Sequence, residues 1–98
     1  MTDKQLVKFA SQFRKGMLGK NPSQWMCFAV SAPLQALLQT HGIEAILTEV
    51  DLGECNHIFL TLPDGRVLDP TADQFNWCSK DPLPPVYLGE PCAIHHAA

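Results

Sequence analysis

The stretch Asn56–Asp69, NHIFLTLPDGRVLD, decides the fold of this 98-residue chain. Two runs rich in strand-forming residues, Asn56–Leu62 and Arg66–Asp69, flank the turn sequence Pro63–Gly65. Proline is favoured at the first central position of a type I turn, and glycine supplies the left-handed bulge position that follows it. The stretch therefore predicts a β-hairpin with a three-residue connection.

The length of that connection fixes which side chains share a face of the hairpin. Three residues pair Thr61 with Val67 and place Phe59 opposite Asp69. Because side chains alternate along a strand, His57 then lies on the same face as Asp69. The two are diagonal neighbours with a Cβ separation somewhat under about 7–8 Å, so an imidazole and a carboxylate that lean together can meet. A two-residue turn would send Asp69 to the other face.

Two helices are expected upstream of the hairpin. Residues 3–15 carry apolar side chains at helical spacing, and Gly16 and Gly19 are expected to end this helix. The main helix is expected from about residue 23 to residue 41, with Gly42 as its stop. One face of it collects apolar residues three and four apart: Cys27, Val30, Leu34, Leu37 and Leu38.

The start of the main helix is open between three positions. Ser23 can cap it, or Asn21 can cap it with the following proline at the first helical position. In the third alternative Ser31 caps a shorter helix and Cys27 precedes it. Pro33 removes one backbone hydrogen bond and is expected to kink the helix.

The rest of the chain completes a small sheet. Residues 44–52 alternate loosely and predict a further strand, whereas the proline-rich C-terminal region allows at most one short edge strand near residues 86–88. Residues 95–98 are expected to be a frayed tail. The order predicts an α+β domain spanning residues 1–98, with N-terminal helices packed on a small antiparallel sheet.

Composition excludes several classes of function. The chain is 46% hydrophobic and 17% charged, with a net charge of −3, which is typical of a globular protein and lacks the basic stripe that nucleic-acid binding needs. No apolar run approaches the roughly 20 residues of a membrane span, so no membrane is expected. The N-terminus does not resemble a signal peptide, which predicts a cytoplasmic protein, with signal-independent export left open. The oligomeric state is also open.

Two cysteine–histidine pairs have a spacing that could bind a metal. Cys55 and His57, like Cys92 and His95, have spacings that resemble half of a zinc site. A structural zinc site usually shows two tight pairs, each in a turn, and Cys55 and Cys78 have no such partner. Four cysteines without a secretion signal are expected to be free thiols. The sequence therefore predicts no metal and no other cofactor, with a small zinc-binding domain as the weakest alternative.

Cys27, His57 and Asp69 together form a different constellation. Singly, each has an ordinary explanation as a core thiol, a structural histidine and a turn aspartate. Near a helix N-terminus, however, the backbone N–H groups and the helix dipole would favour a thiolate at Cys27. His57 would then be its proton partner and Asp69 the group that orients the ring, if folding brings all three into one row.

The segments His57–Leu60 and Leu68–Thr71 carry a family resemblance. They resemble the His…Asp-Pro-Thr signature of transglutaminase-like domains, within the papain-like superfamily, and the chain would be a minimal bacterial or phage member. The resemblance spans Trp25–Phe75 and implies a cysteine that starts a helix packed on a sheet that bears the histidine and the aspartate. It implies Cys27 as the nucleophile, His57 as the acid/base and Asp69 as the orienting group.

The expected activity is a thiol-dependent hydrolase or acyltransferase that acts on an amide, in a peptide or a glutamine side chain, through a thioester. Gln24 is the candidate oxyanion donor, and Trp25 and Trp77 are candidate substrate-binding residues. Hydrolysis is favoured over transfer because a second substrate site needs more chain than is present. The alternative is a catalytically inactive binding module on the same fold.

Overall fold

The computed structural model describes all 98 residues and begins with helix α1, Asp3–Leu18. Thr2 and Gln5 form a reciprocal capping box at its start, and Gly19, with φ of 58°, ends it. The expected end at Gly16 is wrong, because the helix continues for one more turn. That turn buries Leu18, and burial of a leucine outweighs the roughly 1 kcal/mol that a glycine costs inside a helix.

Helix α2 spans Cys27–Thr40, so Cys27 is its first residue. None of the three expected starts is correct, because the capping position is Met26 and no side chain caps the helix. Ser23 is buried and donates instead to Asp73 Oδ1 at 2.7 Å. The helix runs through Pro33, and Gly42, with φ of 77°, follows its end as expected.

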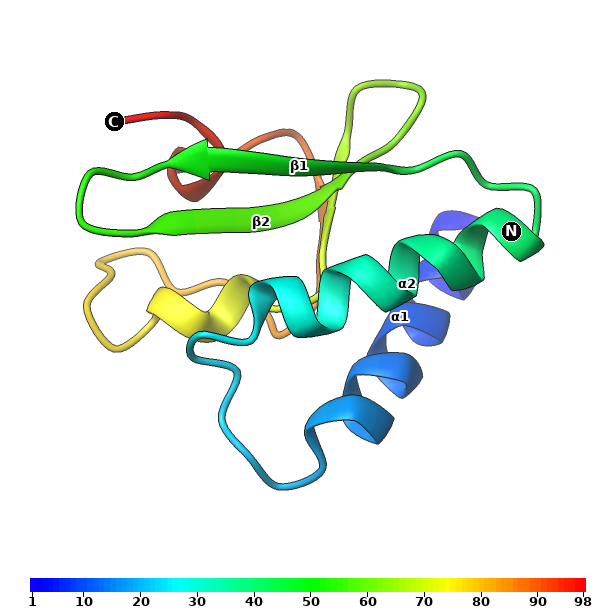
Figure 1. Ribbon diagram of the computed structural model, residues 1–98, viewed down its shortest axis with the longest axis horizontal. Helices are drawn as coiled ribbons and strands as arrows, with labels where there is room; N and C mark the ends of the chain where they lie inside the picture. The colour runs from blue at the N-terminus through cyan, green and yellow to red at the C-terminus, as the bar shows by residue number, and fades with distance from the viewer.

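Four strands form one antiparallel sheet in the order β1-β2-β3-β4 (Figure 1). Their bounds are β1 Ile46–Asp51, β2 Asn56–Thr61, β3 Val67–Asp69 and β4 Tyr87–Gly89. The predicted register of the central hairpin is confirmed: Thr61 pairs with Val67, and Gly65, with φ of 88°, occupies the left-handed turn position. The C-terminal edge strand is present one residue later than expected.

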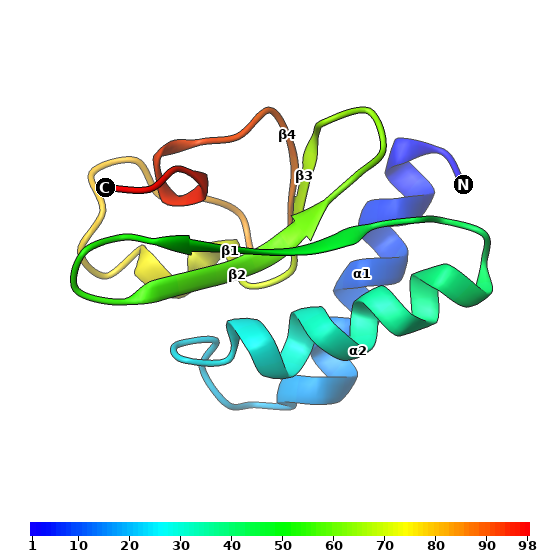
Figure 2. The ribbon, with the colours of Figure 1, turned by 45° about the horizontal axis from the view of Figure 1, so that its top comes forward.

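The two faces of the sheet are covered by different parts of the chain. Helices α1 and α2 lie on one side and the C-terminal segment on the other (Figure 2). The helix side holds the apolar core: Leu6, Ala10, Leu34, Leu38, Ala45, Leu60, Leu62, Leu68 and Val86. The protein is thus an α+β fold with its helices packed on an antiparallel sheet, as the sequence predicts.

The C-terminal segment packs closely on the sheet and is not a frayed tail. The short 3-10 helix η2, Ala93–His95, packs against β2, and His95 is buried. The backbone N–H of Ala98 donates to the carbonyl of Asp51 at 2.8 Å, which ties the end of the chain to β1. The expectation of a loose tail failed because the partner strands lie far away in sequence.

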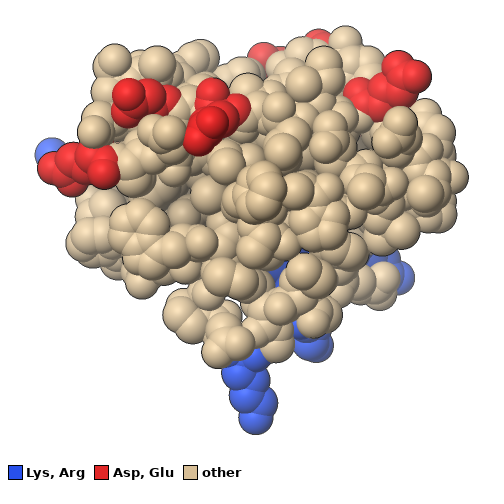
Figure 3. Space-filling model, in the orientation of Figure 1, with Lys and Arg blue, Asp and Glu red and all other residues tan.

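The surface separates its charges. In the view of Figure 3 the Asp and Glu side chains lie along the side of the sheet, and most Lys and Arg side chains lie on the side of α1. Neither helix has the length and apolar character needed to cross a bilayer.

Candidate active site

Cys27 occupies a helix position that favours a thiolate. The first backbone hydrogen bond at the start of α2 runs from the N–H of Val30 to the carbonyl of Met26 at 3.0 Å. The N–H groups of Cys27, Phe28 and Ala29 therefore have no backbone acceptor. These free donors and the positive end of the helix dipole surround the sulfur with groups that stabilise negative charge.

The N-terminus of α2 meets the sheet at an unpaired part of β2. Strand β3 pairs with β2 only at Leu60 and Thr61, which leaves the backbone of Ile58 without a strand partner on that edge. Ser31 Oγ lies 3.5 Å from the Ile58 carbonyl, and the Ile58 backbone also interacts with the Cys27 sulfur. The short third strand thus makes room for the helix to reach the His57 end of β2.

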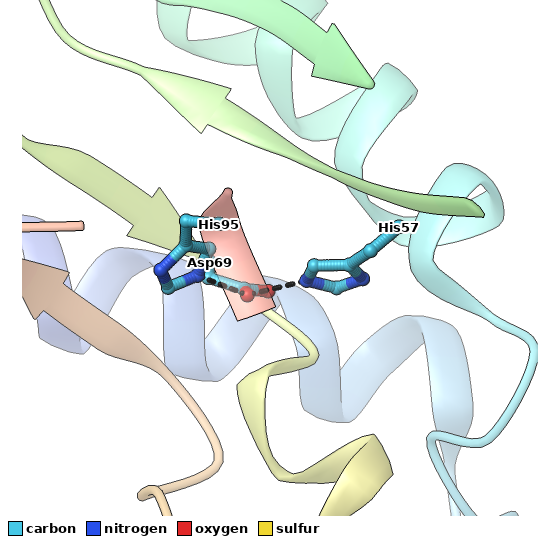
Figure 4. A group of neighbouring side chains, drawn as sticks. All are labelled: His57, Asp69 and His95. Atoms are coloured by element: carbon cyan, nitrogen blue, oxygen red, sulfur yellow. Dashed lines mark hydrogen bonds and ion pairs between the residues drawn. The ribbon is translucent and has the colours of Figure 1, made fainter. Parts of the chain in front are cut away.

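His57 and Asp69 form the pair that the hairpin register predicts. His57 Nε2 donates to Asp69 Oδ2 at 2.7 Å, and both side chains are completely buried (Figure 4). Asp69 Oδ1 accepts the backbone N–H of Thr71 at 3.0 Å. The other ring nitrogen, Nδ1, lies 3.2 Å from Gln74 Nε2, and the ring also neighbours the Cys27 thiol. The three predicted residues therefore lie together, with His57 between Cys27 and Asp69.

The electrostatics of the row favour an ion pair. Burial acts to raise the pKa of Cys27, but hydrogen bonding to His57 and to nearby backbone groups outweighs it, so the pKa lies below its usual value. Burial acts to lower the pKa of His57, yet its bonds to Asp69 and Cys27 raise it to about 9. Burial would raise the pKa of Asp69, but its bonds from His57 and His95 hold it below the usual range. Thiolate, imidazolium and carboxylate are the favoured forms.

Gln74 belongs to the site, although no sequence pattern marks it as a chemical group. Its amide Nε2 lies 3.2 Å from His57 Nδ1 and 2.9 Å from Thr71 Oγ1. In this orientation the amide donates to a neutral His57 ring. Turned end for end, it accepts from an imidazolium, because the Thr71 hydroxyl can either donate or accept. Gln74 can therefore remain bonded in both protonation states of His57.

A partly buried arginine, Arg14, holds the segment that carries Gln74. Arg14 of α1 forms a two-pronged ion pair with Asp73 at 2.7 and 2.8 Å, and it also donates to the carbonyl of Pro70 at 3.1 Å. Ser23, on the loop that leads to Cys27, donates to the same carboxylate. Asp73 thus links α1, the loop before Cys27 and the 3-10 helix η1, Ala72–Phe75. Bidentate arginine–carboxylate pairs give this kind of fixed geometry.

The three predicted oxyanion and substrate-binding residues line one groove. Its volume is about 380 Å³, and its walls are Gln24, Trp25, Glu54, Cys55, Gln74, Phe75, Trp77 and Cys78. Trp25 and Trp77 are 76% and 73% exposed, which is unusual for tryptophan. Trp25 also has φ of 66°, a left-handed conformation that is strained for a bulky residue. Gln74 joins this groove to His57.

A metal-binding geometry exists, but with a different residue set from the zinc spacings in the sequence. One ligand atom each from His57, Asp69 and His95 lies within 4.8 Å of the others. These atoms already bond one another directly, so an ion would have to displace the shared protons. Neither Cys55 nor Cys92 belongs to the group.

The chain matches no protein-family model, no curated protein and no solved structure. The chemistry of the site therefore has to be inferred from its own atoms. Those atoms offer a thiol at a helix N-terminus, a ring bonded to it and a buried carboxylate behind the ring. Such a row can generate a nucleophile and return a proton to a leaving group.

Proposed function

We propose that this protein is a thiol-dependent amide hydrolase of the transglutaminase-like and papain-like type, with Cys27, His57 and Asp69 as its triad. The observation that carries the proposal is the hydrogen bond from His57 Nε2 to the buried Asp69. That bond fixes the ring and leaves Nδ1, which also contacts Gln74, as the nitrogen available to the thiol at the first position of α2. Each partner shifts the pKa of the others toward the charged form that the chemistry requires.

The reaction starts with attack of the Cys27 thiolate on the carbonyl carbon of the substrate. Free N–H groups in the first turn of α2 are the donors for the oxyanion. The C–N bond breaks as His57 gives its Nδ1 proton to the leaving amine, which leaves a thioester on Cys27. His57 then takes a proton from water, which attacks the thioester, releases the carboxylic acid and restores the thiolate.

The groove beside the row is the proposed substrate site. Trp25 and Trp77 offer two exposed indole faces, and Gln74 contacts both the groove and the His57 ring. A peptide or protein amide that packs on the indoles would place its carbonyl near α2. Water is the proposed acceptor, because it needs no binding groove of its own.

Alkylation of the thiol with iodoacetamide across pH tests the proposal. Peptide mapping by mass spectrometry resolves the four cysteines, and exposed Cys78 serves as an internal control thiol. Cys27 is expected to react well below pH 8, where an ordinary thiol is protonated, and to lose this reactivity in His57→Ala. If Cys27 reacts no faster than Cys78 at every pH, the proposed enzymatic function is refuted.

A binding module that lacks activity is the second candidate, and the burial of the site favours it. Cys27 is only 9% exposed and His57 is fully covered, so a substrate reaches the sulfur only if the groove opens. The same alkylation experiment separates the two candidates. A Cys27 thiol that resists a reagent as small as iodoacetamide, in a folded protein that still binds peptides through the tryptophans, would establish the binding module.

A further inference from the structure

His95 shares the carboxylate that orients His57. His95 Nε2 lies 2.8 Å from Asp69 Oδ2, the same oxygen that His57 contacts at 2.7 Å (Figure 4). Both bonds are fully buried. We propose that His95 is a positioning residue of the site, which acts on His57 and Cys27 through Asp69. This inference rests on the proposed function.

The protonation of His95 follows from its second contact. The backbone N–H of Cys92 donates to His95 Nδ1 at 2.9 Å, so that nitrogen has to offer a lone pair and cannot carry a proton. The remaining proton is on Nε2, where it points at Asp69. His95 is therefore a neutral donor with a fixed tautomer, whereas His57 exchanges a proton during the reaction.

The C-terminal segment holds the His95 ring in place. Strand β4 places Tyr87 opposite Asp69, and the Tyr87 ring stacks on His95 with centroids 5.6 Å apart and planes at 24°. Phe59 meets the same ring edge-on at 4.7 Å. Beyond η2 the chain is tied to β1 by the bond from Ala98 to Asp51. Aromatic packing on two sides leaves the ring little freedom to turn away from Asp69.

His95 is the third hydrogen-bond donor to Asp69, and its bond favours the ionised form of this fully buried carboxylate. Asp69 accepts from Thr71 on Oδ1 and from both histidines on Oδ2, so both oxygens are hydrogen-bonded within the protein. Loss of the His95 donor would leave a desolvated oxygen with one bond fewer, which favours protonation of Asp69. A protonated Asp69 would no longer stabilise the imidazolium, and Cys27 would lose its charged partner.

The test compares His95→Phe with His95→Gln. Phenylalanine preserves the aromatic packing and removes the donor, whereas the terminal amide of glutamine can reach Asp69 with an N–H. In His95→Phe the apparent pKa of Cys27, read from its alkylation across pH, is expected to rise by about one unit, with about tenfold slower reaction near pH 6. In His95→Gln the rate is expected to stay within about threefold of wild type.

Each result decides a different point. An unchanged Cys27 profile in a folded His95→Phe protein would overturn the role of His95 while leaving the proposed function intact. An equal shift in both variants would also overturn it, because a purely structural residue would not be rescued by a donor. Failure of the wild-type Cys27 to react faster than Cys78 would instead refute the enzyme itself.

A measurement on the wild-type protein covers the case in which neither variant folds. Nitrogen chemical shifts of the His95 ring at neutral pH are expected to report a proton on Nε2 and none on Nδ1, with slow exchange of the Nε2 proton. A His95 ring that carries its proton on Nδ1 would contradict the inference.

Discussion

Both faces of the sheet are buried, but one carries apolar side chains and the other carries polar ones. Leu60 and Leu68 point toward the helices, and His57 and Asp69 point toward the C-terminal segment, yet all four are fully buried. The leucines gain free energy from burial, roughly 25 cal/mol per Å² of apolar area. The polar pair loses hydration and must recover it through hydrogen bonds. One face therefore accounts for stability and the other requires a different explanation.

Complete hydrogen bonding offsets the cost of burying the polar face, but it does not make that face a net source of folding stability. No buried side-chain nitrogen or oxygen lacks a partner. Well-packed apolar side chains are often at least as stabilising as a satisfied buried ion pair. An oriented imidazole between a thiol and a carboxylate is thus better explained by chemistry than by stability, and the predictions below test that division between the faces.

The largest effect is expected from loss of the thiol. Cys27→Ala should abolish release of nitrophenolate from a p-nitrophenyl ester probe, by on the order of 10³-fold or more, because nothing else in the row can form the acyl intermediate. The control Cys92→Ala, which removes a thiol outside both the row and the groove, should keep turnover near that of wild type. The thermal unfolding midpoint should shift little in both variants. A Cys27→Ala protein that retains turnover would show that Cys27 is not the nucleophile.

The apolar face should respond in the opposite way. Leu60→Ala is expected to lower the free energy of unfolding by about 2–5 kcal/mol, since it leaves a cavity among Leu34, Leu38 and Leu68. Ile46→Ala, on the exposed part of β1, is the matched control and should change it by about 0.5 kcal/mol or less. Urea unfolding followed by circular dichroism measures both. Equal losses would mean that the helix side is not the main core.

Alkaline pH should affect turnover without affecting alkylation. As pH rises through the His57 value of about 9, the imidazolium loses the proton that the leaving amine needs, so amide turnover should fall by about tenfold per pH unit. Alkylation needs only the thiolate and should not fall. The two limits belong to the coupled pair of Cys27 and His57. A turnover profile that keeps rising above pH 9 would contradict His57 as the acid.

Acid should destabilise the polar face through Asp69. Although burial acts to raise the pKa of Asp69, bonds from His57 and His95 hold it below the ordinary value of an aspartate, about 3.9. The carboxylate therefore contributes stability that is present above that value and is lost as pH falls through the folded-state pKa. Wild type should lose unfolding free energy on acidification more steeply than Asp69→Asn, measured by urea titrations at several pH values. The other carboxylates are common to both proteins, so parallel curves would contradict the assignment.

Whether a contact of the polar face can be predicted from the sequence depends on whether local rules, such as strand alternation and turn length, determine it. The pairing of His57 with Asp69 follows from strand alternation and a three-residue turn, which are local rules. Gln74 lies in the irregular segment just after β3, and His95 lies at the end of a long connection. In both places packing, rather than any sequence pattern, chooses the partner. A proline-rich region before His95 indicates a loose end, and only the fold shows that it returns to the sheet.

The start of α2 was unpredictable for a related reason. Each expected cap was a polar side chain, and the helix begins after Met26 with no side-chain cap at all. Ser23, the best local candidate, bonds Asp73 fifty residues away along the chain. An uncapped start leaves donors free at Cys27, so the local capping rules fail at the place where the site needs open N–H groups.

The smallest effect is expected in the groove. Trp77→Ala should raise the KM for peptide amides by about tenfold or less, since an exposed indole contributes on the order of 1 kcal/mol to binding, and should leave kcat and the Cys27 alkylation profile unchanged. Phe28→Ala is the matched control, because Phe28 is 58% exposed and does not line the groove. A lower kcat in Trp77→Ala would mean that the indole takes part in the chemical step. An unchanged KM would mean that the substrate binds elsewhere than in this groove.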